Sequence, residues 1–240
     1  MEYLFGIVIT LIIIVSSASC DPKTQPPVSS NYHHMQMIMQ WPPTFCGRPN
    51  KPCKRSVIML EFPIHGLWPG NATGHTPFTC KVPPNPTTVK KVWLNDRSLK
   101  TSLGFYWPSL VSTDEKLWIH EWEKHGYCTS QIVPDVEYFN GAIVFARQVK
   151  NMLSELRSVQ IIPDNKITYT AANMKKFISE EVLKDKNIHV YISCEKRGHH
   201  FYLKQIHICL DKLLKTIISC PKSFLTRGCG TGNDILFPKS

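Results

Sequence analysis

The sequence predicts a single α+β domain in which an antiparallel sheet packs with helices and disulfides reinforce the fold. Apolar residues recur at helical spacing in the middle of the chain, between residues 114 and 184. Short runs typical of strands occupy the last third, where turns join them. Eight of the nine cysteines lie between residues 21 and 240, enough for four disulfides. Helices and a meander of strands in separate stretches of one chain are typical of α+β domains.

Two strands are expected in the first quarter of the chain. Residues 35–41 alternate Met and Trp with Gln and Ile, which indicates a strand with one strongly buried face. Residues 57–64 form the second strand, which runs straight into His65. The loop between the strands is rich in Pro, and a Cys46–Cys53 bridge could close it. Residues 70–90 are rich in Pro, Thr, Asn and Gly and are expected to form a loop.

Helices are expected in the middle of the chain. A helix capped by Asp114 reaches Lys124 and stops at Gly126. A longer helix opens at Pro134, and a third covers residues 170–184. One face of the longer helix carries the apolar residues Val136, Phe139, Ile143, Val149, Leu153 and Leu156.

Strands are expected again near the C-terminus, at residues 189–194, 201–210 and 214–220. Arg197 and Gly198 supply a turn between the first two. No linker divides the chain, so residues 21–240 are predicted to form one domain.

Residues 1–20 have the pattern of a secretory signal peptide. The apolar run from Tyr3 to Val15 is shorter than the roughly 20 residues that a spanning helix needs. Small residues follow it, which predicts cleavage after Ser19 or Cys20 and export without a membrane anchor. The protein is therefore expected to be secreted and extracellular.

The cysteine pattern agrees with an oxidising compartment. Cleavage after Cys20 removes that cysteine, and the eight others permit 105 pairings that sequence alone does not distinguish. No C-x-x-C pair exists, which argues against a zinc cluster. Asn71-Ala72-Thr73 is a possible glycosylation site in an exported chain.

The charge balance favours a polyanionic partner. After residues 1–20 are removed, 28 basic residues stand against 17 acidic ones, a net charge of +11. Such a charge speeds encounters with nucleic acid, although many secreted proteins are basic for solubility alone.

One helical segment carries four chemically active side chains. On a helix, His120, Glu121, Lys124 and His125 fall within an arc of about 140°. His120-Glu121 also begins the H-E-x-x-H pattern of zinc proteases, which needs a second histidine four residues after the first. That position is Lys124, a cation where a metal ligand is required, so no metal is expected.

A second segment, residues 62–69, ends its apolar run at His65. Gly66 follows, and Trp68-Pro69 closes the segment. A lone histidine at a strand end is as often a satisfied polar residue as a catalytic one.

Together the two segments resemble the active-site segments of the ribonuclease T2 family, a family of secreted enzymes. The residues that match are Phe62-x-Ile64-His65-Gly66-Leu67-Trp68-Pro69 and His120-Glu121-Trp122-x-Lys124-His125-Gly126-x-Cys128. Gln40-Trp41-Pro42 is also similar to the N-terminal strand of that family.

The resemblance implies an endoribonuclease that cleaves single-stranded RNA through 2′,3′-cyclic phosphates and needs no cofactor. His125 would be the general base and His65 the general acid. Lys124 and His120 would bind the phosphate, and Glu121 would orient or polarise it.

The resemblance also assigns base contacts and disulfides. The RNA-binding positions would be Gln40, Trp68, Ser109, Leu110 and Leu117. Leu117, Gly70 and Pro63 depart from residues common in the family, which leaves the base preference open. The implied bridges are Cys46–Cys53, Cys80–Cys128, Cys194–Cys229 and Cys209–Cys220. The other histidines are expected to be surface or structural, namely His33, His34, His75, His189, His199, His200 and His207.

Within that family, the basic charge, the early sequon and the cysteine pattern look more like the pistil ribonucleases of gametophytic self-incompatibility. That class implies a monomer that destroys RNA in self pollen tubes and a pollen-expressed recognition partner, for which loop 70–90 is a candidate surface. The alternatives are a basic stress or defence ribonuclease and a catalytically inactive storage or defence protein. The inactive protein should lack His65, Lys124 or His125, and all three are present.

Overall fold

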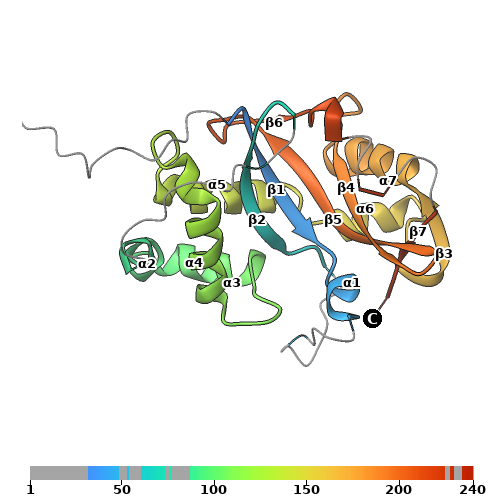
Figure 1. The fold of residues 1–240 in the computed structure, drawn as a ribbon, viewed down its shortest axis with the longest axis horizontal. Helices are drawn as coiled ribbons and strands as arrows, with labels where there is room; N and C mark the ends of the chain where they lie inside the picture. The colour runs from blue at the N-terminus through green and yellow to red at the C-terminus, as the bar shows by residue number, and fades with distance from the viewer. Residues whose placement is uncertain are drawn as a thin grey trace, which may run out of the picture.

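A seven-stranded sheet forms the centre of the molecule (Figure 1). The computed structural model describes residues 32–48, 53, 61–73, 76, 87–224, 228–229 and 234–239. The strands are β1 (His34–Gln40), β2 (Ile64–Gly70), β3 (Asp164–Thr170), β4 (Tyr191–Arg197), β5 (His200–Leu210), β6 (Ile217–Ile218) and β7 (Asp234–Phe237). The α-helices are α1 (Pro42–Cys46), α2 (Thr87–Leu94), α3 (Arg97–Tyr106), α4 (Asp114–Lys124), α5 (Asp135–Gln148), α6 (Met152–Ser158) and α7 (Ala171–Phe177). Shorter helical turns are η2 (Gly126–Thr129), η3 (Ile178–Val182, a π-helix) and η4 (Lys222–Phe224).

The sheet order confirms the α+β prediction and corrects one part of it. The main path runs β2-β1-β5-β7-β3, and β4 and β6 also pair with β5. Strand pairs are antiparallel except β5 and β7, which run parallel through Phe201↔Ile235 and Tyr202↔Leu236. The sheet is therefore mixed and not purely antiparallel. A long connection, and not a hairpin, leads to β7, which allows it to run parallel to β5.

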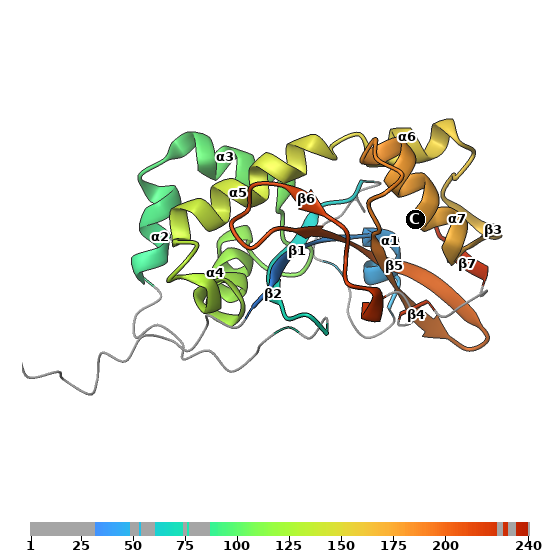
Figure 2. The ribbon, with the colours of Figure 1, turned by 90° about the horizontal axis from the view of Figure 1, so that it is seen from above.

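Helices cover one face of the sheet. Figure 2 shows α3, α5, α6 and α7 on one side of the strands. Met35, Met37 and Met39 of β1 are all at most 2% exposed and belong to the main hydrophobic core, as does Leu67 of β2. The alternate residues of β1 are also buried, which contradicts the prediction of a single buried face. This second face carries Gln36 and Gln40, and it becomes important at the site.

The N-terminal half differs from prediction in several places. His65 is the second residue of β2 and not the end of a strand, and residues 57–60 of the predicted strand lie outside the described residues. Helix α4 has its predicted extent, but its cap is Thr113, whose side chain accepts from the Lys116 N–H. The Asp114 carboxylate instead accepts from the backbone N–H of Ser109 at 2.7 Å. Helix α2 begins inside the expected loop, and α3 was not expected at all.

The predicted long helix is two helices. Helix α5 ends at Gln148, residues 149–151 turn, and α6 begins at Met152. Val136, expected on the buried face, is 45% exposed. The helix expected over 170–184 is present as α7 followed by η3, with the Thr170 hydroxyl accepting from the Asn173 N–H.

The strand expected over 214–220 is reduced to the two residues of β6. Leu214 has a φ of 56°, which is incompatible with a strand. The Asp211 carboxylate accepts from the backbone N–H groups of Leu213, Lys215 and Thr216 and so fixes a turn there. Strands β3 and β7 were not predicted.

Three expected disulfides are present in the structure: Cys46–Cys53, Cys194–Cys229 and Cys209–Cys220. Cys128 is also disulfide-bonded, and its expected partner Cys80 lies outside the described residues. Within the described part of the chain, no helix has the length and apolar character needed to cross a membrane.

Candidate active site

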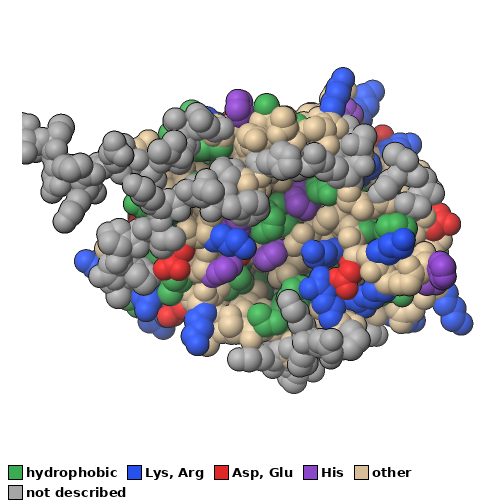
Figure 3. Space-filling view, viewed as in Figure 1, with side chains coloured by type: hydrophobic (Ala, Val, Ile, Leu, Met, Phe, Trp, Pro, Cys, Tyr) green, Lys and Arg blue, Asp and Glu red, His purple; other side chains and the backbone are tan. Residues whose placement is uncertain are grey.

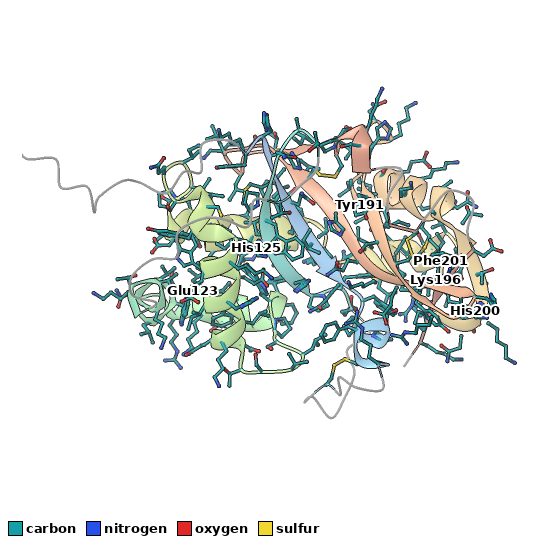
Figure 4. The ribbon with its side chains drawn as sticks, viewed as in Figure 1. Glu123, His125, Tyr191, Lys196, His200 and Phe201 are labelled. Carbon is teal, nitrogen blue, oxygen red and sulfur yellow. A yellow bond between two sulfur atoms is a disulfide. The ribbon has the colours of Figure 1, made fainter. Side chains whose placement is uncertain are left out.

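The site lies where β2 meets α4, on the face of the sheet away from the covering helices. Figure 3 shows histidine and Lys or Arg side chains gathered at the centre of this face. Figure 4 shows the labelled His125 between α4 and β2, with Glu123 on the far side of the helix. Strand β2 supplies His65 and Trp68, and α4 supplies Glu121 and, at its C-terminal cap, His125.

The Trp68 indole holds the site together. Its ring stacks on the His125 imidazole with centroids 4.7 Å apart and an interplanar angle of 27°. The His65 ring meets it edge-on at 5.3 Å. The indole N–H donates to Glu121 Oε2 at 2.7 Å. These contacts make Trp68 a scaffold for both imidazoles, and its predicted contact with RNA stays a prediction.

Gly66 is the residue that allows this approach. A Cβ atom at position 66 would lie 2.1 Å from Glu121 Oε2 and 2.2 Å from Trp68 Nε1. Only glycine leaves space for the carboxylate and the indole to meet over the strand. Backbone contacts fix the strand itself, since the Trp107 indole donates to the His65 carbonyl at 2.9 Å and the Tyr138 hydroxyl to the Leu67 carbonyl at 2.7 Å.

Burial shifts the pKa values of the ionisable groups strongly. Desolvation lowers the pKa of His125 to about 3, and repulsion from Lys124, His65 and His120 adds to the effect. Desolvation also lowers the pKa of His65 to about 4, with contributions from Lys204, His120 and Lys124. Both imidazoles are therefore neutral at pH 7 in the free protein.

Glu121 shifts in the opposite direction. The side chain is 2% exposed, and desolvation raises its pKa to about 7, although the Trp68 hydrogen bond and Lys124 oppose this. Its Oε1 lies 3.9 Å from His65 Nε2. At pH 7 the Glu121 carboxyl is therefore protonated in about half of the molecules, beside a neutral His65.

The remaining predicted residues lie in different settings. His120 and Lys124 are exposed on α4, and their repulsive effects on both imidazoles place them at the same site. Gln40 is 4% exposed and pairs with Gln205 across β1 and β5. Ser109 and Leu110 are buried after α3, and Leu117 packs partly buried against the core. Of the predicted base contacts, Gln40, Ser109 and Leu110 are thus buried, and Leu117 is partly exposed.

Two residues at the site were missed from the sequence. His207 of β5 is 7% exposed, its ring lies 6.5 Å from that of Trp68, and burial lowers its pKa to about 3. Gln205 lies two residues earlier, and its amide contacts His65. The available signal was the period-two pattern of β5, in which Gln205 and His207 alternate with buried isoleucines. His34 is also buried, whereas His33, His189, His199 and His200 are exposed, and His75 lies outside the described residues.

No group of three or more His, Cys, Asp or Glu side chains that could bind a metal occurs among the described residues. The Asn71 side chain accepts from the N–H and hydroxyl of Thr73, at 3.0 Å and 2.8 Å.

The model of the Ribonuclease T2 family matches residues 32–220, which include every residue of this site. The chain belongs to the ribonuclease T2 family. It is a metal-independent endoribonuclease of the plant type that includes both S ribonucleases and their S-like relatives.

Individual relatives cover nearly the whole chain. Ribonuclease S-7 of Nicotiana alata is 31% identical over 88% of this chain and 92% of its own. Ribonuclease 1 of Arabidopsis thaliana is 29% identical over 96% of this chain and 95% of its own. The crystal structure of the Japanese pear S3-RNase superposes with a TM-score of 0.67 at 25% identity, covering 85% of this chain and 99% of that one. Extracellular ribonuclease LE and intracellular ribonuclease LX of Solanum lycopersicum are each 29% identical to this chain.

The titration of the buried histidines predicts a pH-dependent stability. The pKa values of His65, His125 and His207 lie below the 6.5 of an unfolded histidine, so the unfolded chain binds more protons below pH 6.5. Folding stability therefore falls as the pH drops from about 6.5 toward 3. Glu121, with its raised pKa, opposes this trend between about pH 4.5 and 7, so the decline is steepest below 4.5.

The variant His207→Phe isolates one of these groups, because His207 already packs against Tyr191 as an aromatic ring. Each proton contributes a slope of about 1.4 kcal/mol per pH unit to the free energy of unfolding. Urea denaturation between pH 4 and 7 should give a shallower slope for the variant than for the parent chain. Equal slopes would show that His207 titrates normally.

Proposed function

We propose that this protein cleaves single-stranded RNA by transesterification, with His125 as general base and His65 as general acid. The observation that carries the proposal is the packing of both imidazoles on Trp68, whose N–H binds the buried Glu121 carboxylate. This arrangement gives two proton-transfer groups at fixed positions, and RNA supplies its own nucleophile in the 2′-hydroxyl.

The reaction begins at the 2′-hydroxyl. His125, held neutral by its low pKa, takes the 2′-hydroxyl proton as O2′ attacks phosphorus. The bond from phosphorus to the 5′-oxygen breaks, and His65 gives that oxygen a proton. The products are a 2′,3′-cyclic phosphate and a 5′-hydroxyl. DNA has no 2′-hydroxyl and is not a substrate.

The acid step requires a proton on His65, whose pKa is about 4 in the free protein. Glu121, whose pKa is about 7, lies with its Oε1 3.9 Å from His65 Nε2, the nitrogen that gives up the proton in the acid step. A bound phosphodiester brings negative charge beside the ring and favours the imidazolium. Substrate binding therefore raises the pKa of His65 and favours its protonated, acidic form.

In this mechanism, the exposed side chains of α4 bind the phosphate. Lys124 and His120 stand at the C-terminal half of the helix, beside the two imidazoles. Their positive charge stabilises the phosphorane-like transition state. Gln40, Ser109, Leu110 and Leu117 stay predicted base contacts, and crystals with a bound dinucleotide test them.

The decisive test uses recombinant protein purified from a host free of related ribonucleases. Incubation with single-stranded RNA and EDTA should give 2′,3′-cyclic phosphate ends, and the His65→Asn variant prepared in parallel should give none. An inactive parent protein, or equal activity in both preparations, would contradict the proposed function.

We further propose that the enzyme is the pistil factor of gametophytic self-incompatibility and degrades RNA in self pollen tubes. The net charge of +11 after removal of residues 1–20 and the likeness to S ribonucleases of Nicotiana and pear support this role. Most of loop 70–90, the candidate surface for a pollen partner, lies outside the described residues.

A stress or defence ribonuclease is the second candidate, because Ribonuclease 1 of Arabidopsis matches nearly as well. Transcript abundance distinguishes the two. Expression confined to the style supports the incompatibility role, and induction in other tissues by phosphate starvation contradicts it.

Export is the remaining part of the proposal. The apolar run of residues 3–15 supports it, and the relatives LE and LX show that the family includes both extracellular and intracellular members. N-terminal sequencing of protein recovered from culture medium should begin at Cys20 or Asp21. A shift in mass on deglycosylation, absent in Asn71→Gln, would place a glycan at the sequon.

A further inference from the structure

Gln205 approaches the proposed general acid from the sheet. It lies on β5, is 6% exposed, and its side-chain nitrogen is 2.5 Å from His65 Nδ1. The contact joins strands that are not neighbours, since β1 lies between β2 and β5. It is therefore made by side chains across the face of the sheet on which the site lies.

A second hydrogen bond fixes which way the amide points. The Ser193 hydroxyl of β4 lies 3.3 Å from Gln205 Oε1 and can donate to it. With its oxygen turned toward Ser193, the amide presents its NH2 group to His65. An amide NH2 only donates, so Nδ1 of His65 must accept and carries no proton.

The tautomer of His65 follows from this contact. A neutral imidazole with an acceptor at Nδ1 has its proton on Nε2. Nε2 is the nitrogen 3.9 Å from Glu121 Oε1. The proton therefore lies on the side of the ring that faces Glu121.

We propose that Gln205, oriented by Ser193, is a positioning residue that holds the resting, neutral His65 as its Nε2–H tautomer and keeps Nε2 directed at the reacting phosphate. This inference rests on the proposed role of His65 as the general acid. The roles proposed for Glu121, Lys124 and His125 do not depend on this role of Gln205.

An amide suits this position better than a carboxylate. A carboxylate at residue 205 would bind an Nδ1–H group and stabilise the imidazolium, so the acid would hold its proton more tightly. The neutral amide can serve both protonation states, because a rotated amide accepts from Nδ1–H while its NH2 donates to the Ser193 oxygen. A serine hydroxyl donates or accepts as required. His65 is thus held in place while its proton leaves and returns.

Several charged or titratable groups also face His65. A change in the pKa of His65 must therefore be compared with the effects of these groups. They are Glu121, His120, Lys124 and His125 from α4 and Lys204 and His207 from β5. The side-chain nitrogen of Gln205 lies at hydrogen-bonding distance from Nδ1 of His65.

The direct test is nitrogen NMR of the folded protein labelled in its histidines, which needs no activity. At neutral pH, His65 should show an unprotonated Nδ1 and a protonated Nε2. Gln205→Met should give a mixture of tautomers. Gln36→Met is the matched control, because Gln36 is an equally buried amide on the same face that contacts His207 instead. It should leave His65 unchanged. A protonated Nδ1 in the parent protein would overturn the proposal, even if RNA cleavage is established.

Kinetics supply the second readout. Gln205→Met should lower kcat for RNA cleavage by about 10-fold to 10²-fold, with KM within about twofold, since misorientation of a catalytic group affects the chemical step. Gln205→Glu should move the basic limb of the pH–rate profile upward by about one unit. It is nearly isosteric and keeps the proposal testable if the Met variant does not fold. An unmoved limb in Gln205→Glu, or a kcat unchanged in Gln205→Met, would contradict the positioning role.

Discussion

The His125→Asn variant is expected to cleave RNA about 10²-fold to 10⁴-fold more slowly than the parent enzyme, because it lacks the group that accepts the 2′-hydroxyl proton. Asparagine keeps a planar polar group beside Trp68 but cannot take up a proton at neutral pH. The loss should therefore appear in kcat, with KM little changed.

Steady-state cleavage of a defined oligonucleotide, followed by the release of cyclic phosphate ends, measures this effect. Glu123→Gln is the matched control, since Glu123 lies two residues away on the far side of α4 (Figure 4). The control should retain full activity. A rate loss below about tenfold in His125→Asn would assign the base to another group.

Gly66→Ala is expected to remove activity and to destabilise the fold together. The added methyl group would lie 2.1 Å from Glu121 Oε2 and 2.2 Å from Trp68 Nε1, so their 2.7 Å hydrogen bond cannot persist. A strained core substitution costs about 1–3 kcal/mol, and a buried acceptor left unpaired adds about 1–3 kcal/mol. His65 is the preceding residue, and a displacement of about 1 Å can lower a rate by about 10²-fold.

Gly104→Ala provides the comparison for this variant. Gly104 lies in α3, and a Cβ atom there would meet nothing closer than Asp114 Oδ2 at 3.9 Å. Alanine in a helix should be neutral or stabilise by up to about 1 kcal/mol. Thermal melts and cleavage rates of both variants test this prediction. A Gly66→Ala enzyme with normal rate and melting temperature would show that the contact between the Trp68 indole and the Glu121 carboxylate is dispensable.

The catalytic helix could be predicted from the sequence because its information is local. Four reactive side chains occur within six residues, just before Gly126, and helical periodicity alone brings them to one face. His65 was assigned to a strand end because Gly66 and Pro69 are usual strand breakers. The structure keeps both in β2, where the glycine admits Glu121 and the proline lies in an edge strand.

The parts that could not be predicted depend on contacts between distant segments. Gln205 and His207 become part of the site only when β5 pairs with β1, and nothing near them in the chain indicates His65. Strand β3 has largely exposed side chains and thus no apolar pattern, and its pairing partner β7 is only four residues long. Helix α3 depends on the Asp96 carboxylate, which accepts from the Leu99 N–H and starts a helix of weakly apolar composition.

The parallel pairing of β5 with β7 sets the order in which the fold can be completed during synthesis. Strands β1, β2 and β5, which carry His65 and Gln205, can pair as soon as β5 has been made. Strand β3 is made before β5, yet in the described sheet it pairs only with β7, the last strand of the chain. The nascent chain therefore carries an unpaired strand edge until β7 inserts between β5 and β3. Chaperones that shield such edges should bind ribosome-held chains that stop before residue 234 and release those in which β7 is free to insert.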